Sequence, residues 1–332
     1  MTRGLRYAAH FLRYRFRDLH PFEVQAVLLN ACNLRCRYCR CPEIPVPQMT
    51  TVQWVDALGR FARAGTLRVK FQGGEPTIRR DFAEIAAASR AAGIITAVVT
   101  NGLAIAERPA LLDHLDEVVV SLDALTPARH DAWRGAGTHA PAVAALEAAA
   151  ARGRAAYVNM VVHRDTLEEV EPMLEFCERQ GYGLNAQAVM FGADYQDASA
   201  RGEIGLTDAE ERALYAQLAR WRAAGRSLMF SAASYRRTSR WHDFRVLSIA
   251  RDGPSRCMAG RDYLHVEANG DVHPCIVHTG PFTPRNLVRD GFEVAVRHAR
   301  HHSCVDCSLA YLNERKALFG LRPGAVFGML RR

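Results

Sequence analysis

Three cysteines near the start of the chain have a spacing that suits an iron–sulfur cluster. Cys32, Cys36 and Cys39 lie four and three residues apart, directly after an apolar run at 23–30. Three thiolates on one tight loop can bind three irons of a [4Fe–4S] cube, which leaves the fourth iron open to a substrate. The alternative is a structural zinc site that takes Cys41 as its fourth thiolate.

Four more cysteines in the last quarter of the chain could enclose a second metal centre. Cys257 is followed by Gly270 and Cys275, and a later loop holds Cys304 and Cys307. Four thiolates are enough to ligate a metal centre completely, so such a site would have no open position for a substrate. The same ligands also suit a closed tetrahedral zinc site, which stays the alternative here.

Polar motifs follow three further apolar runs of the chain. They read Gln72-Gly73-Gly74-Glu75-Pro76, Thr100-Asn101-Gly102 and Ser121-Leu122-Asp123. Paired glycines let a backbone approach a ligand closely, and exposed polar groups there can hold an amino-acid moiety. In a β/α barrel the carboxyl ends of the strands share one rim, where active sites are built. Together with the cysteine loop, the three motifs predict one active site at that rim.

Alternating apolar and amphipathic runs predict β–α units around a parallel sheet. The expected strands, largely apolar as strands buried on both faces should be, are Glu23–Asn30, Leu67–Gln72, Ile95–Thr100, Glu117–Leu122, Ala155–Val162 and Leu184–Met190. The expected helices between them are Val52–Ala64, Phe82–Ala92, Arg108–Leu115, Pro141–Arg152 and Leu167–Gln180. Six units are fewer than the eight of a closed barrel. The predicted fold is therefore α/β, a partial (β/α)6 TIM-like barrel.

The remaining chain is predicted to form a small C-terminal hairpin-plus-helix iron–sulfur domain. A helical pattern runs from 208 to 222, and Asn269-Gly270 between apolar runs predicts a β-hairpin over Tyr263–Ile276. The expected domains are an amphipathic helix at 1–22, the barrel at 23–225 and the small domain at 226–332.

The cysteine loop and the glycine motif together resemble the radical S-adenosylmethionine (SAM) superfamily. The CxxxCxxC loop carries an aromatic residue, Tyr38, before its third cysteine, and Gly73–Pro76 follows one unit later. The resemblance covers about residues 23–190. It implies that the three cysteines of the loop hold a [4Fe–4S] cluster whose open iron binds the amino and carboxylate groups of SAM.

The same resemblance implies the cofactor contacts. It places Tyr38 against the adenine and Gly73–Pro76 at the methionyl amino group, and it makes Arg134 the expected partner of the SAM carboxylate. The expected cofactor-binding residues are Tyr38, Gly73, Gly74, Glu75, Pro76, Thr100, Asn101, Ser121, Asp123, Arg134 and Asn159. No catalytic residue beyond these is assigned from the sequence.

The second cysteine group resembles the SPASM/twitch type of extension found in many radical SAM enzymes. Fuller SPASM versions carry more cysteines and bind two auxiliary clusters. Of the nine cysteines here, three lie in the first loop and four in the second group, which leaves only Cys41 and Cys177. The resemblance therefore implies one auxiliary [4Fe–4S] cluster, with electron relay or support of the lid as its expected role.

The composition is that of a soluble globular protein. The 332 residues are 49% hydrophobic and 23% charged, and no run approaches the ~18 apolar residues of a membrane-spanning helix. The formal charge of +8 comes almost entirely from arginines spread along the chain, which argues against nucleic-acid binding. We expect a cytoplasmic protein. Residues 1–22 would form a helix that packs on the barrel or contacts a membrane or lipid.

The sequence predicts an enzyme that cleaves SAM reductively and abstracts hydrogen from a small-molecule intermediate such as a sugar, nucleoside or lipid. Only 22 residues precede the first strand, which favours this reading over the alternative, a peptide- or protein-modifying maturase. A low-potential electron donor such as flavodoxin or ferredoxin is the expected partner. The alternative from another class is a non-catalytic iron–sulfur electron carrier or a zinc-stabilised binding protein, which would have no need of the motif at Gly73–Pro76.

Overall fold

Six parallel strands form the barrel sheet in the order in which they follow one another along the chain. They are β1 (Glu23–Leu29), β2 (Arg68–Gly73), β3 (Ile95–Thr100), β4 (Glu117–Ser121), β5 (Ala155–Val162) and β6 (Gly183–Ala188). This computed structural model describes residues 21–191, 198–251, 257–278 and 282–322, together with Ala9, Phe11 and Tyr14. The strands match the predicted ones closely, and the predicted partial barrel of class α/β is confirmed.

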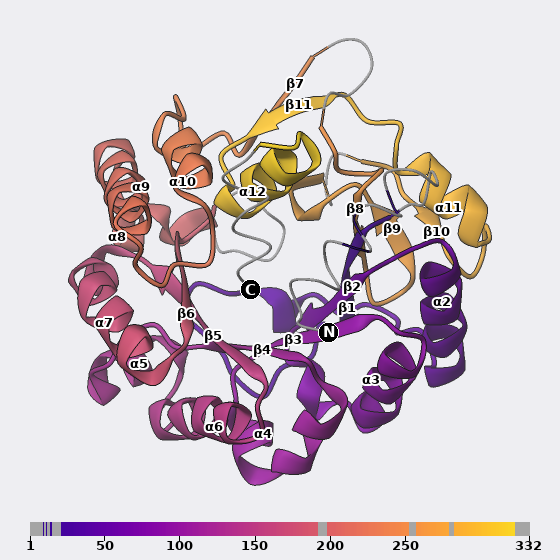
Figure 1. Cartoon of the computed structure of the whole chain (residues 1–332), viewed down its shortest axis with the longest axis horizontal. Coiled ribbons are helices and arrows are strands. Elements are labelled where there is room, and N and C mark those ends of the chain that lie inside the picture. Colours follow the sequence, from indigo (N-terminus) through magenta and orange to yellow (C-terminus); the bar gives the residue numbers. More distant parts are fainter. Residues whose placement is uncertain are drawn as a thin grey trace.

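Helices pack on the convex side of this curved sheet (Figure 1). They are α2 (Thr51–Arg63), α3 (Phe82–Ala91), α4 (Leu103–Glu107), α5 (Pro127–Arg134), α6 (His139–Ala151) and α7 (Val170–Gln180), with the 3-10 helices η2 (Pro76–Ile78), η3 (Pro109–His114) and η4 (Arg164–Glu169). The helix expected over Arg108–Leu115 is present over Pro109–His114, as the 3-10 helix η3. Pro109 lacks an N–H and disfavours helical backbone at the residue before it, so α4 ends at Glu107 and a tighter turn follows.

Strands from the C-terminal part extend the barrel sheet beyond β1. The strand β8 (Tyr263–Val266) pairs in parallel with β1, and β9 (Asp271–His273) and β10 (Arg285–Asn286) continue the sheet in antiparallel pairing. The predicted hairpin is confirmed, since β8 and β9 flank a turn in which Gly270 has a φ of +89°. The parallel pairing of β8 with β1 was not predicted.

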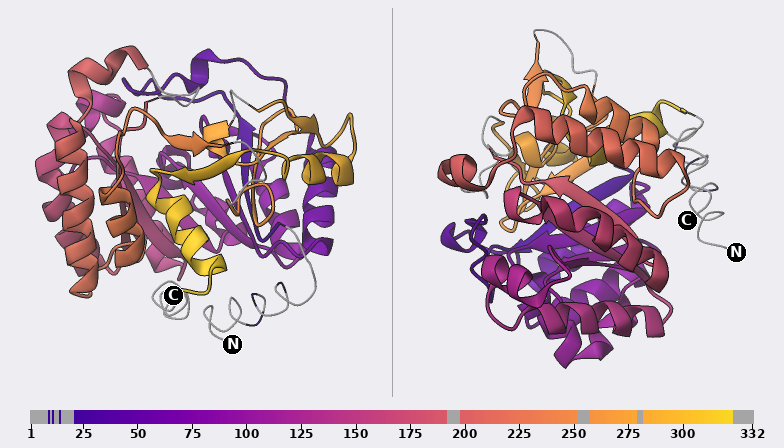
Figure 2. Two further views of the ribbon diagram at one scale, coloured as in Figure 1. Left: turned by 90° about the horizontal axis from the view of Figure 1, so that it is seen from above. Right: turned by 90° about the vertical axis from the view of Figure 1, so that its left-hand side faces the viewer.

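The rest of the C-terminal part forms a lid beside the barrel (Figure 2). Its elements are η5 (Ala198–Ala200), α8 (Arg201–Ile204), α9 (Asp208–Ala223), α10 (Ala232–Ser239), β7 (Ser248–Ala250), η6 (Ile276–His278), α11 (Phe292–His298), β11 (Cys304–Cys307) and α12 (Ala310–Phe319). Helix α12 lies on the concave side of the sheet (Figure 1). In the described part of the chain, no helix is long and apolar enough to cross a membrane. The division at 225/226 stays a prediction.

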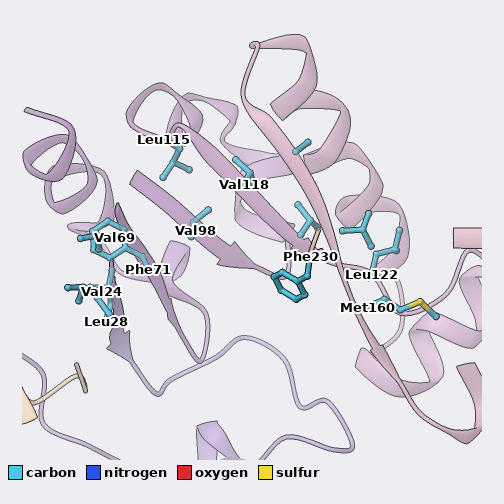
Figure 3. Packing of buried hydrophobic residues seen from close by; sticks show 14 of the residues in the cluster. Val24, Leu28, Val69, Phe71, Val98, Leu115, Val118, Leu122, Met160 and Phe230 are labelled. Carbon is cyan, nitrogen blue, oxygen red and sulfur yellow. The ribbon is translucent and has the colours of Figure 1, made fainter. Parts of the chain in front are cut away.

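The two faces of the barrel strands differ sharply in polarity. Side chains on the outer face, such as Val69, Phe71 and Val98, are buried and form the core beneath the surrounding helices (Figure 3). The inner face carries polar side chains on β1, β2, β4, β5 and β6: Gln25, Arg68, Lys70, Gln72, Glu117, Asn159, Asn185 and Gln187. The expectation of strands apolar on both faces is therefore wrong for the lumen.

Five residues of the predicted N-terminal helix over 1–22 are described, namely Ala9, Phe11, Tyr14, Pro21 and Phe22. Phe11 and Tyr14 are helical and buried, with ring centroids 5.9 and 5.1 Å from that of Phe22, and both also contact Phe319. Most of the predicted helix over 1–22, and with it the contact to a membrane or lipid, lies outside the described residues.

A buried ion cluster ties the lid to the barrel. Arg68 on β2 binds Glu23 on β1 and Glu117 on β4, each at 2.6 Å. Arg315 on α12 binds the second oxygen of Glu23 at 2.6 Å, and the Tyr311 hydroxyl donates to Glu23 as well. Burial alone would raise the pKa of Glu23, but the charges of Arg315 and Arg68 lower it to about 2.

Removing the central cation of this cluster should destabilise the protein strongly. We expect Arg68→Met to lower the free energy of unfolding by about 3–5 kcal/mol, because it leaves buried carboxylates short of a counter-charge. The control is Arg60→Met, which breaks an exposed pair with Asp56 at 2.8 Å and should cost less than about 1 kcal/mol. Chemical denaturation followed by fluorescence gives both free energies of unfolding. Equal losses of stability in the two variants would contradict the proposal that the cluster stabilises the protein strongly.

Candidate active site

The four predicted motifs meet in one pocket at the carboxyl ends of β1 to β4. The pocket has a volume of about 220 Å³. The predicted residues on its wall are Cys32, Cys36, Cys39, Tyr38, Gly73, Gly74, Glu75, Thr100, Asn101, Ser121 and Arg134. Cys41, in the 3-10 helix η1 (Cys41–Glu43), and Ile276 also line it. Ile276 comes from the lid, and the sequence carried no signal that would have placed it here.

The chemistry of the three pocket thiols fits an iron–sulfur cluster. Burial raises the pKa of Cys32 to about 11 and also raises the pKa values of Cys36 and Cys39. All three thiols lie on the wall of the same pocket, and the Cys39 N–H donates to the Cys36 carbonyl at 2.9 Å. Among the described residues, no three His, Cys, Asp or Glu side chains gather closely enough to hold a single metal ion. In a [4Fe–4S] cube, each thiolate binds a different iron.

The paired glycines fit against the cysteine loop. Gly74 donates its N–H to the carbonyl of Leu29 at 2.8 Å, and Glu75 donates to that of Ala31 at 3.0 Å. A Cβ on Gly74 would lie 2.2 Å from the Ala31 oxygen, and one on Gly73, whose φ is +139°, would lie 2.1 Å from the Leu29 oxygen. The glycines are therefore required for close contact with the end of β1, whatever ligand they also face.

Glu75 joins the second and third motifs. Its buried carboxylate accepts hydrogen bonds from the Thr100 hydroxyl at 2.8 Å, from the N–H of Asn101 at 2.7 Å and from the N–H of Thr77 at 3.0 Å. Burial raises its pKa despite these bonds. Asn101 in turn donates to the Asn33 side chain in the cysteine loop at 2.8 Å. One network thus holds three strand ends together.

Asp123 lies behind the pocket wall and positions two residues that form it. The Tyr38 hydroxyl donates to this fully buried carboxylate at 2.6 Å, and Arg134 binds both of its oxygens, at 2.6 and 3.0 Å. Burial would raise the pKa of Asp123, but the Arg134 charge and these hydrogen bonds lower it. The geometry therefore gives Asp123 a positioning role toward Tyr38 and Arg134.

Two further predicted residues lie away from the wall of this pocket. Pro76 is buried at the start of η2, beside it. Asn159 on β5 lines a second cavity of about 280 Å³, here called the lumen cavity, where it accepts a hydrogen bond from Asn185 at 2.7 Å. Gln72, Val99 and Ile276 lie on the walls of both cavities, so the two adjoin.

The four cysteines of the second group also come together. A hydrogen bond between the Cys257 and Cys304 thiols lowers the pKa of Cys257 and raises that of Cys304, and Cys307 and Cys275 add to the electrostatic effect on Cys304. This donor set suits a fully ligated cluster.

Lid helices hold the last two cysteines, which lie on strand β11 and not on the loop expected from the sequence. Lys316 on α12 donates to the carbonyl of Val305 at 2.9 Å, and Arg237 on α10 binds Asp306 at 2.6 Å. The sequence pattern did not indicate either contact.

Comparison with known proteins gives the family. Residues 27–177 match the model described as the Radical SAM superfamily. Mycofactocin maturase MftC of Mycobacterium ulcerans is 31% identical over 277 residues, which cover 80% of this chain and 71% of that protein. PqqA peptide cyclase of Streptomyces rochei is 29% identical over 269 residues, covering 75% of this chain and 67% of that protein. The chain belongs to the radical SAM superfamily.

A solved structure has the same fold. SuiB of Streptococcus suis, bound to its precursor peptide SuiA, matches with a TM-score of 0.66 and 18% identity over 94% of this chain and 77% of that one. The protein is thus a radical SAM enzyme that uses a [4Fe–4S] cluster and SAM, and the interpretation as a carrier or binding protein is wrong. With SAM and the cluster bound, cleavage of SAM would supply a 5′-deoxyadenosyl radical able to remove a hydrogen atom from a substrate.

The contact of Gly74 with the cysteine loop leads to a direct test. We expect Gly74→Ala to lose about four irons per chain, one cluster's worth, because the added Cβ forces the loop away from the end of β1. The control is Gly59→Ala in α2, where a Cβ would meet only the Arg63 side chain at 3.5 Å. Iron and sulfide analysis after anaerobic reconstitution gives the counts. Full loading of Gly74→Ala would contradict the role assigned to this contact.

Proposed function

We propose that this enzyme modifies a peptide or protein, by removing hydrogen from one residue that enters the lumen cavity. The names of two relatives support this, since one acts on the PqqA peptide and SuiB binds the precursor peptide SuiA. The small-molecule substrate favoured by the sequence has less support than this alternative.

The position and size of the lumen cavity carry the proposal. It adjoins the pocket at the carboxyl ends of β1 to β4, here called the SAM pocket, because Gln72, Val99 and Ile276 line both. A group inside the lumen cavity therefore lies next to the expected position of SAM. Its volume of about 280 Å³ is at the lower end of the range for small-molecule sites. That volume suits one large side chain, with the rest of the substrate outside the barrel.

The residues that hold the cofactors follow from the same proposal. Cys32, Cys36 and Cys39 would bind the SAM cluster, with Glu75 and Arg134 on the wall that receives the methionyl part of SAM. The four cysteines of the second group would bind one auxiliary [4Fe–4S] cluster. A low-potential electron carrier is the expected reductant.

Fractionation of a cell extract tests the substrate class. The loaded enzyme is given SAM, reductant and an extract of cells that encode it, divided into a peptide fraction and a small-molecule fraction. We expect the peptide fraction to stimulate release of 5′-deoxyadenosine and protease treatment to abolish the stimulation. Stimulation by the small-molecule fraction, resistant to protease, would overturn the proposal.

Variants in the two cysteine groups should differ in whether they still cleave SAM. We expect Cys304→Ala to lose about four irons per chain and to keep cleaving SAM without forming modified product, because the auxiliary site acts after cleavage. Cys32→Ala should lose cleavage itself.

The control for both variants is Cys177→Ala, at a buried cysteine of α7 that belongs to neither group. It should keep all its iron. Loss of SAM cleavage in Cys304→Ala, with the barrel folded and its cluster loaded, would contradict a downstream role.

A further inference from the structure

Lys70 lines the lumen cavity but forms no ion pair with the described residues of the ion cluster beside it. It lies on β2 between Arg68 and Gln72, on the strand face that lines the cavity. Arg68 is occupied, since it binds Glu23 and Glu117 at 2.6 Å each.

The other charged side chains on the cavity wall also have partners. Arg315 binds Glu23 at 2.6 Å. Glu314 accepts hydrogen bonds from the N–H and the hydroxyl of Ser231 at 2.9 and 2.6 Å, at the start of α10. Arg315 thus joins the lid to the barrel, and Glu314 joins two helices within the lid.

Lys70 differs from all of them. In the described part of the chain, its ammonium has no carboxylate and no hydrogen-bond acceptor at bonding distance. It lies over the ring of Tyr311, with Nζ 4.3 Å from the ring centroid. A cation–π contact of this kind is much weaker than an ion pair in a buried site.

The charges around Lys70 do not make up for a missing partner. Burial and the Arg68 charge lower the pKa of Lys70 to about 7, and Glu23 on β1 and Glu117 on β4 oppose this only in part, since Arg315 on α12 also lowers it. A structural lysine normally extends its ammonium to water or pairs it with a carboxylate. A cation that faces a cavity without a partner is suited to an anionic ligand.

We propose that Lys70 binds a carboxylate of the substrate inside the lumen cavity. This rests on the proposed function and refines it, because the residue that enters the barrel would then carry or adjoin a carboxylate. Two sources have this chemistry, an acidic side chain and a C-terminal carboxylate.

The position of Lys70 sets where the bound carboxylate lies. Gln72, on the boundary between the lumen cavity and the SAM pocket, is two residues further along β2. At the rise of a β-strand, these two residue positions are about 7 Å apart along β2. A carboxylate held by Lys70 would therefore lie close to the boundary between the two cavities.

The proposal can be tested without turnover, because the chain has only two lysines, Lys70 and Lys316. In the cluster-loaded enzyme with SAM, lysine labelled with ¹³C at Cε gives two NMR signals, which a Lys316→Arg variant assigns. Three probes are titrated: N-acetyl-glutamic acid amide, N-acetyl-glutamine with a free carboxylate, and N-acetyl-glutamine amide as the neutral control.

We expect one of the two carboxylate probes to shift the Lys70 signal toward that of a protonated amine, while the neutral amide leaves it unchanged. A response to the first probe alone identifies an acidic side chain as the source, and a response to the second alone identifies a C-terminus. No response to either carboxylate at high millimolar concentration, or an equal response to the neutral amide, would overturn the proposal.

Substitution of Lys70 gives the second measurement. Lys70→Met should weaken binding of the responding probe at least about tenfold, whereas Lys70→Arg, which keeps the charge, should retain most of it. Equal binding by wild type and a folded Lys70→Met variant would overturn the proposal. Neither measurement needs a peptide or catalysis. The binding results for Lys70 could therefore still be interpreted if the extract experiment identified a small-molecule substrate.

Discussion

Two backbone hydrogen bonds at the end of β1 set the geometry on which the active site depends. Gly74 and Glu75 donate to Leu29 and Ala31 at 2.8 and 3.0 Å, which is possible only because residues 73 and 74 have no side chain. This contact fixes the cysteine loop against the end of β2. The Glu75 carboxylate then extends the connection to β3. The three thiols are therefore held by the backbone of the sheet, and their positions do not depend on the loop alone.

The lumen face of the sheet is polar, whereas its outer face is apolar. Apolar packing against α2 to α7 stabilises the barrel from outside, whereas the inner face keeps polar side chains that only a specific partner can satisfy. The lid supplies some of these partners, since Arg315 and Tyr311 of α12 bind Glu23. Among the described residues, Lys70 has no carboxylate partner, and under our proposal a substrate carboxylate would supply it.

Much of the barrel and most of the pocket wall were predictable from the sequence. Strand bounds such as those of β3 and β5 follow from apolar runs, and strand-end motifs meet at one rim in any such barrel. Contacts between distant segments were not predictable, because periodicity carries no information about them. Examples are the parallel pairing of β8 with β1 and the contact of Lys316 on α12 with Val305 on β11. Asp123 shows a subtler limit, since a polar residue at a strand end can face away from the pocket to support its neighbours.

Helix α12 contacts both the lumen cavity and the second cysteine group. Its Tyr311 and Arg315 line the lumen cavity, while Lys316, the residue after Arg315, donates to Val305 on β11, between Cys304 and Cys307. A change of this helix that suits a new substrate would also disturb the second cysteine group. The shape of the lumen cavity and the support of the second cysteine group therefore cannot be altered independently through this helix.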